Sequence, residues 1–334
     1  MAKVLVTGGT GFLGQHILEA LVADGLPAGD IAVFSRNGDD ALAERGFEVV
    51  VGSVTSRAHL AQAAQGCEFI YHLAGRVDRS PSALGNMMRV HVEGTRNVML
   101  AAAEAKVGRV VYASTSGTIG VSRRAEDVAT EDDPYPLEIV KKWPYYLSKI
   151  YAEQAALQAA KDVNVDLVTV NPTLLLGPGD DRQSSTGDVL KFMRRQIPSV
   201  PSGGMSFVDA RDVASATVAA AKLGRPGKRY LMTAANWTID KFFRQLEGIT
   251  GVKAPVLKLP DSAARMAARV MQWGYETAGR TPPVDRISVE MSQHYWYVDA
   301  TRARSELGFS PRDPDDTLRE TVEDLRNRYG LPVN

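Results

Sequence analysis

The sequence predicts an α/β fold in which a parallel β-sheet is covered by helices on both faces. Short apolar runs rich in Val, Ile and Phe alternate with helical patterns through the first half of the chain. A glycine-rich turn joins the first of these runs to the first helical pattern. Strands that alternate with helices are connected by right-handed crossovers, so we expect them to lie parallel in one doubly wound sheet.

Five apolar runs in the first half are expected to be strands, because they are short and bounded by turn residues. In chain order they read KVLVTG, DIAVFS, FEVVVG, EFIYHLA and GRVVYAST. The segments between them predict helices over 12–24, 56–64 and 84–106, with a short turn or helix after the second strand. A further unit combines a helix over 144–162, whose Pro144 suits a first helical turn, with the strand VDLVTVN.

This rhythm changes in the second half of the chain, where helical patterns such as FVDARDVASATVAAAKL and DTLRETVEDLRNRYG mix with short strands. We therefore expect a first domain over 1–175 and a smaller, mostly helical α/β region over 176–334 that binds the substrate. No linker rich in Pro, Gly or Ser separates the two. For this reason some later segments are expected to return to the first domain.

Composition excludes several classes of partner. The 334 residues contain 44% hydrophobic and 23% charged residues, as in an ordinary globular protein. Lys and Arg together number 39, as do Asp and Glu, so no field of one sign attracts nucleic acid or an anionic membrane surface. The single cysteine, Cys67, fits a reducing compartment and is expected to be a buried small hydrophobe. No apolar run is long enough to cross a bilayer, so we expect a cytoplasmic protein without membrane insertion.

The glycine-rich turn, VTGGTGFLGQHILEAL, predicts a dinucleotide site. It follows an apolar strand and opens an amphipathic helix, which is the context that this motif requires. Glycines let the backbone approach a pyrophosphate, which then lies on the amide-rich end of the helix. The pattern fits either Gly8 or Gly9 as its first glycine. A Rossmann-type domain with cofactor contacts at this turn is therefore expected, from Gly8, Gly11, Phe12, Leu13 and Gly14.

The end of the second strand bears on the choice of dinucleotide. A carboxylate there would accept hydrogen bonds from the ribose 2′-hydroxyl of NAD, whereas an arginine accommodates the 2′-phosphate of NADP. The chain has Ser35 and Arg36 at this point and no acid before Asp39. We therefore favour NADP(H) over NAD(H), with Arg36 as a plain surface charge the alternative.

Motifs along nearly the whole chain resemble the extended short-chain dehydrogenase/reductases, in the NAD-dependent epimerase/dehydratase superfamily. They include TGGTGFLG, HLAG, HVEGTRNV, VVYASTSGTIG, YYLSK, NPTLLLGPGD, FVDARDVASA and DATRARSELGFSPR. Within this family, WPYYLSKIYAEQAA followed by VDLVTVNPTLLLGPG looks most like the dihydroflavonol-reductase-like branch. The resemblance implies an NAD(P)-dependent oxidoreductase.

The resemblance implies that Tyr145 and Lys149 form the catalytic pair, because the family motif is Tyr-x-x-x-Lys. Tyr146 also lies at helical spacing from the lysine, but is expected to pack or to line the pocket. A phenol has a pKa of about 10, and a neighbouring ammonium favours its phenolate. In the family the lysine also hydrogen-bonds the nicotinamide ribose. The third member is a Ser or Thr after the fifth strand, which falls on Thr115, with Ser114 as the alternative.

The resemblance also extends the set of expected cofactor contacts. Two positions depart from the family pattern. Ser53 replaces an Asp that in many family members contacts the adenine of the cofactor. His91 replaces an Asn that in many family members supports the catalytic lysine. His91 is expected to be a structural histidine, with a proton relay as the alternative. His59 and His72 lack metal-ligand spacing, so we expect no metal. The added cofactor contacts are Ser53, Val54, Leu73, Ala74, Gly75, Tyr145, Lys149 and Pro172.

Together these features predict an NADP(H)-dependent reductase of a ketone or aldehyde, mainly apolar or aromatic. Hydride would pass from nicotinamide C4 to the carbonyl carbon while Tyr145 donates a proton to the oxygen. The partner expected is a small-molecule carbonyl substrate. The aromatic and Met-rich segments near 261–299 suit an apolar pocket or the surface of a homodimer, and ordinary core packing is the preferred interpretation for most of their side chains. No nucleic acid is expected.

Three other readings remain open at this point. A nucleotide-sugar epimerase or dehydratase would use the same residues with tightly bound NAD, and Lys191, Arg194 and Arg195 are the candidate grip for its diphosphate or else a solvated face. The late HYWYVDATRARSELGFSPR is similar to hydroxysteroid-type dehydrogenases and to hopanoid-associated, epimerase-like proteins. A redox-sensing binding protein would keep the dinucleotide site without the chemistry.

Overall fold

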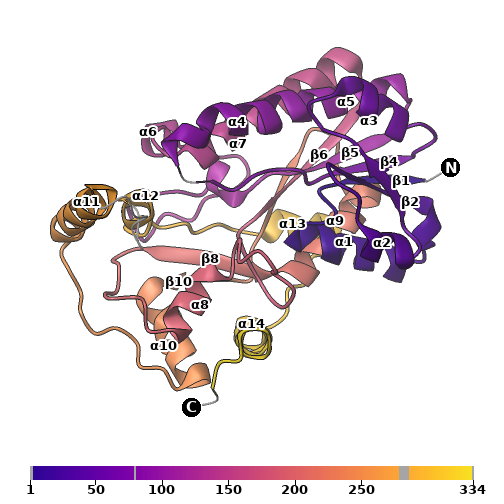
Figure 1. The fold of residues 1–334 in the computed structure, drawn as a ribbon. Coiled ribbons are helices and arrows are strands. Elements are labelled where there is room, and N and C mark those ends of the chain that lie inside the picture. Colours follow the sequence, from indigo (N-terminus) through magenta and orange to yellow (C-terminus); the bar gives the residue numbers. More distant parts are fainter. Residues whose placement is uncertain (1–2, 79, 278–285, 333–334) are drawn as a thin grey trace.

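A seven-stranded sheet forms the centre of the molecule in the computed structural model, which describes residues 3–78, 80–277 and 286–332 (Figure 1). Its order is β3-β2-β1-β4-β5-β6-β9, and all neighbouring strands pair in parallel, so the predicted fold class is confirmed. The strands are β1 (Val4–Thr7), β2 (Ile31–Ser35), β3 (Glu48–Val51), β4 (Phe69–His72), β5 (Arg109–Ala113), β6 (Asp166–Pro172) and β9 (Arg229–Met232).

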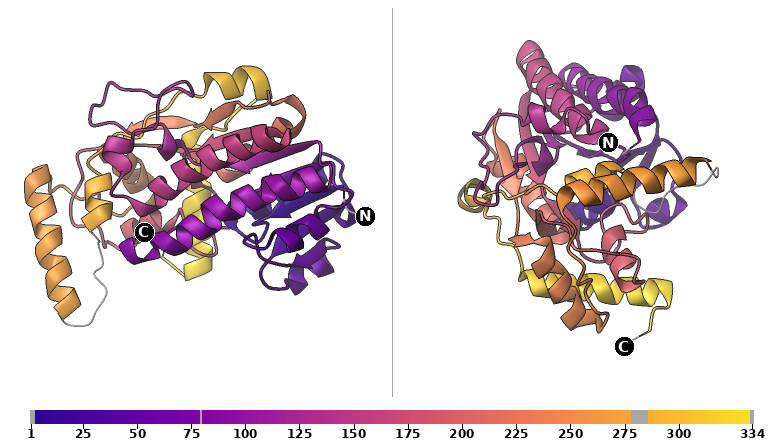
Figure 2. Two further views of the ribbon diagram at one scale, coloured as in Figure 1. Left: turned by 90° about the horizontal axis from the view of Figure 1, so that it is seen from above. Right: turned by 90° about the vertical axis from the view of Figure 1, so that its left-hand side faces the viewer.

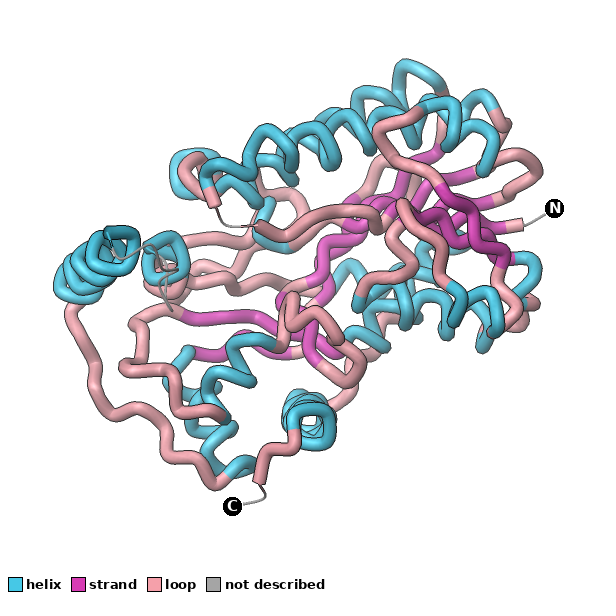
Figure 3. The backbone as a smooth tube through the Cα atoms, viewed as in Figure 1, coloured by secondary structure: helices cyan, strands magenta, loops and turns pink. Residues whose placement is uncertain are grey.

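Helices cover both faces of this sheet, as Figure 3 shows. Alternate residues of each strand point to opposite faces, so Val4 and Val6 of β1 belong to the core on one side and Leu5 to the core on the other. The first core is closed by α1 (Phe12–Ala23), α2 (Asp40–Glu44), α9 (Ala210–Leu223) and α13 (Thr301–Leu307). The second is closed by α3 (Arg57–Ala63), α5 (Gly94–Glu104) and α7 (Pro144–Val163). Cys67 is buried in the second core.

The uninterrupted helix expected over 84–106 contains a change of helical type. It runs as α4 (Leu84–Met88), a π-helical turn η3 (Arg89–Glu93) and α5. Such widened turns occur frequently at functional sites, and this one contains His91, which contacts Ser148 of α7. At the start of α5, Gly94 lies so close to the Val54 side chain that a Cβ atom would approach it to 2.9 Å.

A second, three-stranded sheet lies beside the first. Its order is β10-β8-β7, with β8 parallel to β7 and antiparallel to β10. An apolar core joins this sheet to three helices. These strands and helices are β7 (Leu174–Leu176), β8 (Gly204–Asp209), β10 (Ala235–Thr238), α8 (Gly187–Met193), α10 (Ile239–Thr250) and α14 (Pro314–Tyr329).

Several segments that follow residue 175 pack with the first sheet. β9 pairs with β6, and α9 and α13 join the core that α1 covers. The chain therefore crosses between the two regions more than once, and β7 already belongs to the second sheet although it begins at Leu174.

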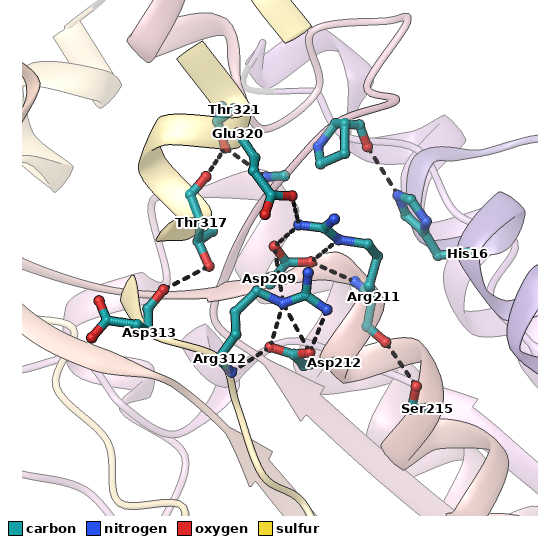
Figure 4. A network of polar contacts seen from close by, with 12 residues as sticks. His16, Asp209, Arg211, Asp212, Ser215, Arg312, Asp313, Thr317, Glu320 and Thr321 are labelled. Carbon is teal, nitrogen blue, oxygen red and sulfur yellow. Dashed lines mark hydrogen bonds and ion pairs between the residues drawn. The ribbon is translucent and has the colours of Figure 1, made fainter. Parts of the chain in front are cut away.

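A polar network holds the two regions together at the start of α9 (Figure 4). Asp209 is fully buried and accepts hydrogen bonds from the Arg211 side chain. Burial raises its pKa, but the hydrogen bonds from Arg211 outweigh this effect and lower the pKa below its ordinary value. Arg211 also pairs with Glu320 of α14 at 2.5 Å, and Arg312 pairs with Asp212 of α9 at 2.8 Å.

Helix α11 (Asp261–Thr277) stands at the edge of the molecule, at the end of the second region farthest from the seven-stranded sheet (Figure 2). Beside it, α12 (Arg286–Met291) contributes Ile287 and Met291 to an apolar cluster with the short helix α6 (Leu137–Val140) and with α7. Within the described ranges, no helix has the length and apolar character needed to span a bilayer. The remaining short 3₁₀ turns are η1 (Ala28–Asp30), η2 (Pro81–Ala83) and η4 (Ser116–Thr118).

Candidate active site

A cavity of about 620 Å³ opens at the carboxyl ends of the parallel strands and extends between the two regions. This is where ligands bind in doubly wound sheets, next to the point at which the strand order reverses. Here that point lies between β1 and β4. The structure brings together in the lining of the cavity most of the residues predicted from the sequence, namely Gly8, Gly11, Phe12, Leu13, Gly14, Leu73, Gly75, Thr115, Tyr145, Lys149 and Pro172.

Five predicted cofactor residues lie outside this lining: Ser35, Arg36, Ser53, Val54 and Ala74. Because Ser35 pairs with Val51 in the register of β2 and β3, the segments of Arg36 and Ser53 leave the sheet side by side. Arg36 is exposed there. The nearby Asp39 caps α2, since its carboxylate accepts the backbone N–H of Leu42 at 3.1 Å. No carboxylate therefore occupies the end of β2 itself.

The glycine turn is shaped by close backbone approaches. Gly8 has φ of +76°, and a Cβ atom at this position would lie 2.7 Å from the backbone nitrogen of Ala74. At Gly14 a Cβ atom would lie 2.7 Å from the Cα of Gly9 and nearer still to the Gly8 carbonyl. The turn thus places the N-terminus of α1 at the cavity. The backbone N–H groups of the first helical turn suit a pyrophosphate there.

The two tyrosines at the start of α7 have different surroundings. Both line the cavity, and their rings meet edge to face with centroids 5.1 Å apart. Tyr146 also packs against Trp296, at a centroid distance of 4.9 Å, and lies over Gly117, where a Cβ atom would collide with its ring. Trp143 completes this aromatic cluster, 5.5 Å from Trp296. Tyr145 instead lies toward His91, with ring centroids 6.0 Å apart.

Lys149 is buried one turn after Tyr145, and its ammonium donates a hydrogen bond to the Ala113 carbonyl at 2.9 Å. Burial lowers the pKa of this lysine to about 8, although the nearby Glu153 opposes the change. For Tyr145, burial raises the pKa above the ordinary value of a phenol, and Tyr146 adds to the effect. Desolvation is thus the main influence on the pKa of this phenol in the structure.

Hydrogen bonds distinguish the two hydroxyl groups after β5. Ser114 also lines the cavity, but its hydroxyl donates a hydrogen bond to the Glu153 carboxylate at 2.8 Å and is therefore already engaged by the protein. Among the hydrogen bonds within the described residues, the Thr115 hydroxyl takes part in one, a long bond of 3.4 Å that it accepts from the Gly117 N–H. The Asn171 amide donates to the Thr115 carbonyl at 3.2 Å, which holds the backbone of this residue in place.

Sequence reasoning missed Glu153, which lies under the site. Its side chain is fully buried, and it receives hydrogen bonds from Ser114 and Asn171 while Arg229 lies 3.8 Å away. Burial raises the pKa of this carboxyl group, against the opposing effect of Arg229. Its spacing from Lys149 could have revealed it in the sequence, because residues four positions apart in a helix lie on the same face.

His91 has both ring nitrogens occupied by the protein. The backbone N–H of Arg76 donates to Nε2 at 2.9 Å, which leaves the ring proton on Nδ1, 2.9 Å from the Ser148 hydroxyl. Ser148 in turn donates to the Tyr145 carbonyl at 2.7 Å. Burial, with the charge of Lys149, lowers the pKa of His91 to about 3, so the ring is neutral. These contacts are those of a structural histidine that anchors the start of α7.

The metal-binding residue types do not gather in this region. Across residues 3–78, 80–277 and 286–332, no group of three or more His, Cys, Asp or Glu side chains is placed to hold a metal ion. His72, for example, lies between the hydroxyls of Thr7 and Thr95, at 2.7 and 3.0 Å.

This fold, with a glycine turn and a Tyr–Lys pair at one cavity, defines an NAD(P)-dependent oxidoreductase of the extended short-chain dehydrogenase/reductase class. The chain belongs to the NAD-dependent epimerase/dehydratase family, whose model matches residues 4–232. A nicotinamide dinucleotide is accordingly the cofactor of this class.

Individual relatives match almost the whole chain. A Synechocystis protein assigned provisionally as a dihydroflavonol 4-reductase is 32% identical and aligns over 96% of this chain and 94% of its own length. Sterol demethylase protein B of Methylococcus capsulatus is 30% identical over 97% and 98% of the two chains. Among solved structures, that of gox2253 superposes with a TM-score of 0.84 at 30% identity, covering 99% of this chain and 100% of the other. The Synechocystis relative supports the dihydroflavonol-reductase-like branch of the family.

Proposed function

We propose that the protein is an NADP(H)-dependent reductase of an apolar or aromatic ketone or aldehyde. The observation that carries this proposal is the apolar lining of the cavity beyond Tyr145. That part is built from aromatic, Met and Ile side chains of the second region, and such walls favour a substrate with little charge. The side chains are Phe242, Phe243, Met271, Ile287, Met291 and Trp296.

The basic residues considered as a diphosphate grip argue against a sugar nucleotide. Lys191 lines the cavity, but its ammonium pairs with Asp188 at 3.0 Å. Arg194 instead lies over the Tyr329 ring, 5.3 Å from its centroid. Arg195, at φ of +58°, follows the end of α8 and is not part of the cavity lining. A strong ionic anchor for a diphosphate would need more than this one paired lysine.

The residues around the reacting carbonyl have distinct roles in this proposal. When bound, the dinucleotide supplies the hydride. Tyr145 donates the proton to the substrate oxygen, and its raised pKa keeps the phenol protonated at neutral pH. Thr115 holds the same oxygen, since its hydroxyl has fewer commitments than that of Ser114. Lys149, which the Ala113 carbonyl holds in place, would hydrogen-bond the nicotinamide ribose of the bound cofactor.

The glycine turn fits the pyrophosphate of the cofactor, because side chains at positions 8 and 14 would collide with neighbouring backbone and displace the turn.

Arg36 is our candidate for the 2′-phosphate contact. Arg36→Ala is expected to weaken NADPH binding about 10-fold or more, since an ionic hydrogen bond contributes about 1.5–3 kcal/mol, and to leave NADH binding nearly unchanged. Calorimetric titration of both cofactors measures this. Equal losses for the two cofactors, or a wild-type preference for NADH, would remove the argument.

One experiment separates a reductase from an epimerase. Purified protein is expected to carry little bound dinucleotide by native mass spectrometry and to consume NADPH in proportion to an apolar ketone taken from a small panel. The panel includes a polycyclic ketone, because the name of the Methylococcus relative refers to a sterol and favours the hydroxysteroid-type variant of this chemistry. Retained NAD together with interconversion of sugar nucleotides, and no net change in NADPH absorbance, would overturn the proposal.

A further inference from the structure

Two adjacent hydroxyl groups follow β5, and a buried carboxylate treats them differently. Ser114 and Thr115 both line the cavity. The Ser114 hydroxyl donates to the carboxylate of Glu153 at 2.8 Å, and Glu153 is fully buried. The one hydrogen bond of the Thr115 hydroxyl within the described residues is the long one from the Gly117 N–H. Glu153 therefore engages one of the two hydroxyls and leaves the other to a ligand.

Glu153 also reaches the neighbouring strand β6 through Asn171. The Asn171 amide donates to the Glu153 carboxylate at 3.4 Å and to the Thr115 carbonyl at 3.2 Å. It donates as well to the Thr118 hydroxyl of η4, which in turn donates to the Thr115 carbonyl at 2.8 Å. One carboxylate of α7 is thus connected, directly or through Asn171, to both strands that end beneath the site.

The same helix carries the Tyr–Lys pair. Lys149 lies one turn before Glu153, and its ammonium donates to the carbonyl of Ala113, the residue just before Ser114. Two neighbouring residues at the end of β5 are therefore tied to α7, each by a different side chain of the helix. Burial raises the pKa of Glu153, which shows that its charged form is unfavourable there. An apolar side chain would fill this space without that penalty, so packing alone does not account for a carboxyl group.

We propose that Glu153 is a positioning residue for carbonyl reduction, because it engages the Ser114 hydroxyl and so leaves Thr115 to hold the substrate oxygen. It also keeps the strand end that bears Thr115 in place relative to the helix that bears Tyr145 and Lys149. Catalysis is sensitive to such placement, since a displacement of about 1 Å can lower the rate by about 10²-fold. This role rests on the proposed function, because it concerns the step at the carbonyl.

The first test compares Glu153→Met with Glu153→Gln. Met fills a similar volume without accepting the hydrogen bond, whereas the side-chain oxygen of Gln still accepts it from Ser114. Glu153→Met is expected to lower kcat for NADPH-dependent ketone reduction by about 10²-fold and to change NADPH affinity little. Glu153→Gln is expected to recover most of the lost kcat. Equal losses in the two variants would overturn the proposal.

Ser114→Ala removes the same hydrogen bond from its other end, through a change small enough to leave the fold intact. It is expected to lower kcat by about 10-fold, as loss of one hydrogen bond to a charged group allows. The double variant Ser114→Ala/Glu153→Met should lose no more than Glu153→Met alone, because both changes break one bond. Losses that multiply in the double variant would contradict a joint role.

The matched control is Glu131→Met. Glu131 is also a buried carboxyl group, 5% exposed, and it accepts the Leu231 N–H at 2.9 Å. It lies outside the cavity lining. This variant should keep a kcat near that of the wild type even where its thermal midpoint falls. A loss of kcat as large as that of Glu153→Met would show that burial of a carboxyl group, rather than its bond to Ser114, explains the effect.

Hydrogen exchange of the free protein gives a readout that needs no substrate. Residues 114–118 are expected to exchange at least about 10-fold faster in Glu153→Met, and near the wild-type rate in Glu153→Gln and Glu131→Met. A wild-type protein that reduces no ketone would contradict the proposed function, and the exchange rates would then decide the positioning on their own. Unchanged exchange in Glu153→Met would overturn the positioning whether or not the protein is a reductase.

Discussion

Tyr145→Phe is expected to lower turnover by about 10²–10⁴-fold, the usual effect of removing a general acid, whereas Tyr146→Phe is expected to have a far smaller effect. Tyr145 lies one helical turn before Lys149 and beside His91, whose bond to Ser148 anchors this turn of α7. Tyr146 is committed to packing against Trp143 and Trp296.

Stopped-flow measurement of NADPH oxidation with a ketone substrate checks the prediction, with calorimetric titration of NADPH as the control for binding. Cofactor affinity should be retained in Tyr145→Phe, because the change removes one hydroxyl from a ring that stays in place. Equal losses of turnover in the two variants would contradict the assignment, as would a loss confined to Tyr146→Phe.

Gly14→Ala is expected to abolish measurable dinucleotide binding and to lower the free energy of unfolding by about 3 kcal/mol, the upper end for overpacking. The added Cβ would meet the Gly8 carbonyl and the Gly9 Cα, and both are backbone atoms of the turn that cannot rotate away. Relief requires α1 to move away from the turn, which moves its N-terminal N–H groups from the position suited to a pyrophosphate.

Chemical denaturation and NADPH titration measure the two effects of Gly14→Ala. Gly85→Ala is the matched control, since an added Cβ in α4 meets open space and alanine favours a helix by about 0.5–1 kcal/mol over glycine. This control should bind NADPH normally and be at least as stable as the wild type. If Gly14→Ala binds NADPH like the wild type, the close approach within the turn is not needed for the cofactor.

Local patterns in the sequence were sufficient for six strands of the parallel sheet, because each carries its own periodicity and the connections between them allow one handedness. The seventh strand, β9, was not predicted, because it returns to this sheet from the second half of the chain. The helix expected over 144–162 lies within one residue of α7, and the glycine turn falls between β1 and α1. The helical type of residues 89–93 was not predicted, and neither was the contact of its His91 with Ser148, which is 57 residues away in the chain.

Charge environments could not be predicted from spacing. Spacing placed Lys149 near Tyr145 and suggested a lowered pKa for the phenol, but the degree to which folding removes water from both side chains decides the sign. Glu153 is a similar case. Its place in the helix is local, whereas its contacts with Ser114 and Asn171 join segments that are 39 and 18 residues away in the chain.

The sequence by itself determined the class of this protein: its sheet, its glycine turn and the Tyr–Lys spacing are all properties of short segments. Only the tertiary structure decided how the two tyrosines differ, because Trp296 comes from a segment 150 residues away and packs on Tyr146 rather than on Tyr145. The tertiary structure likewise decided which side of α11 faces the cavity. Periodicity identifies an apolar side of a helix, but only packing shows whether protein already covers it.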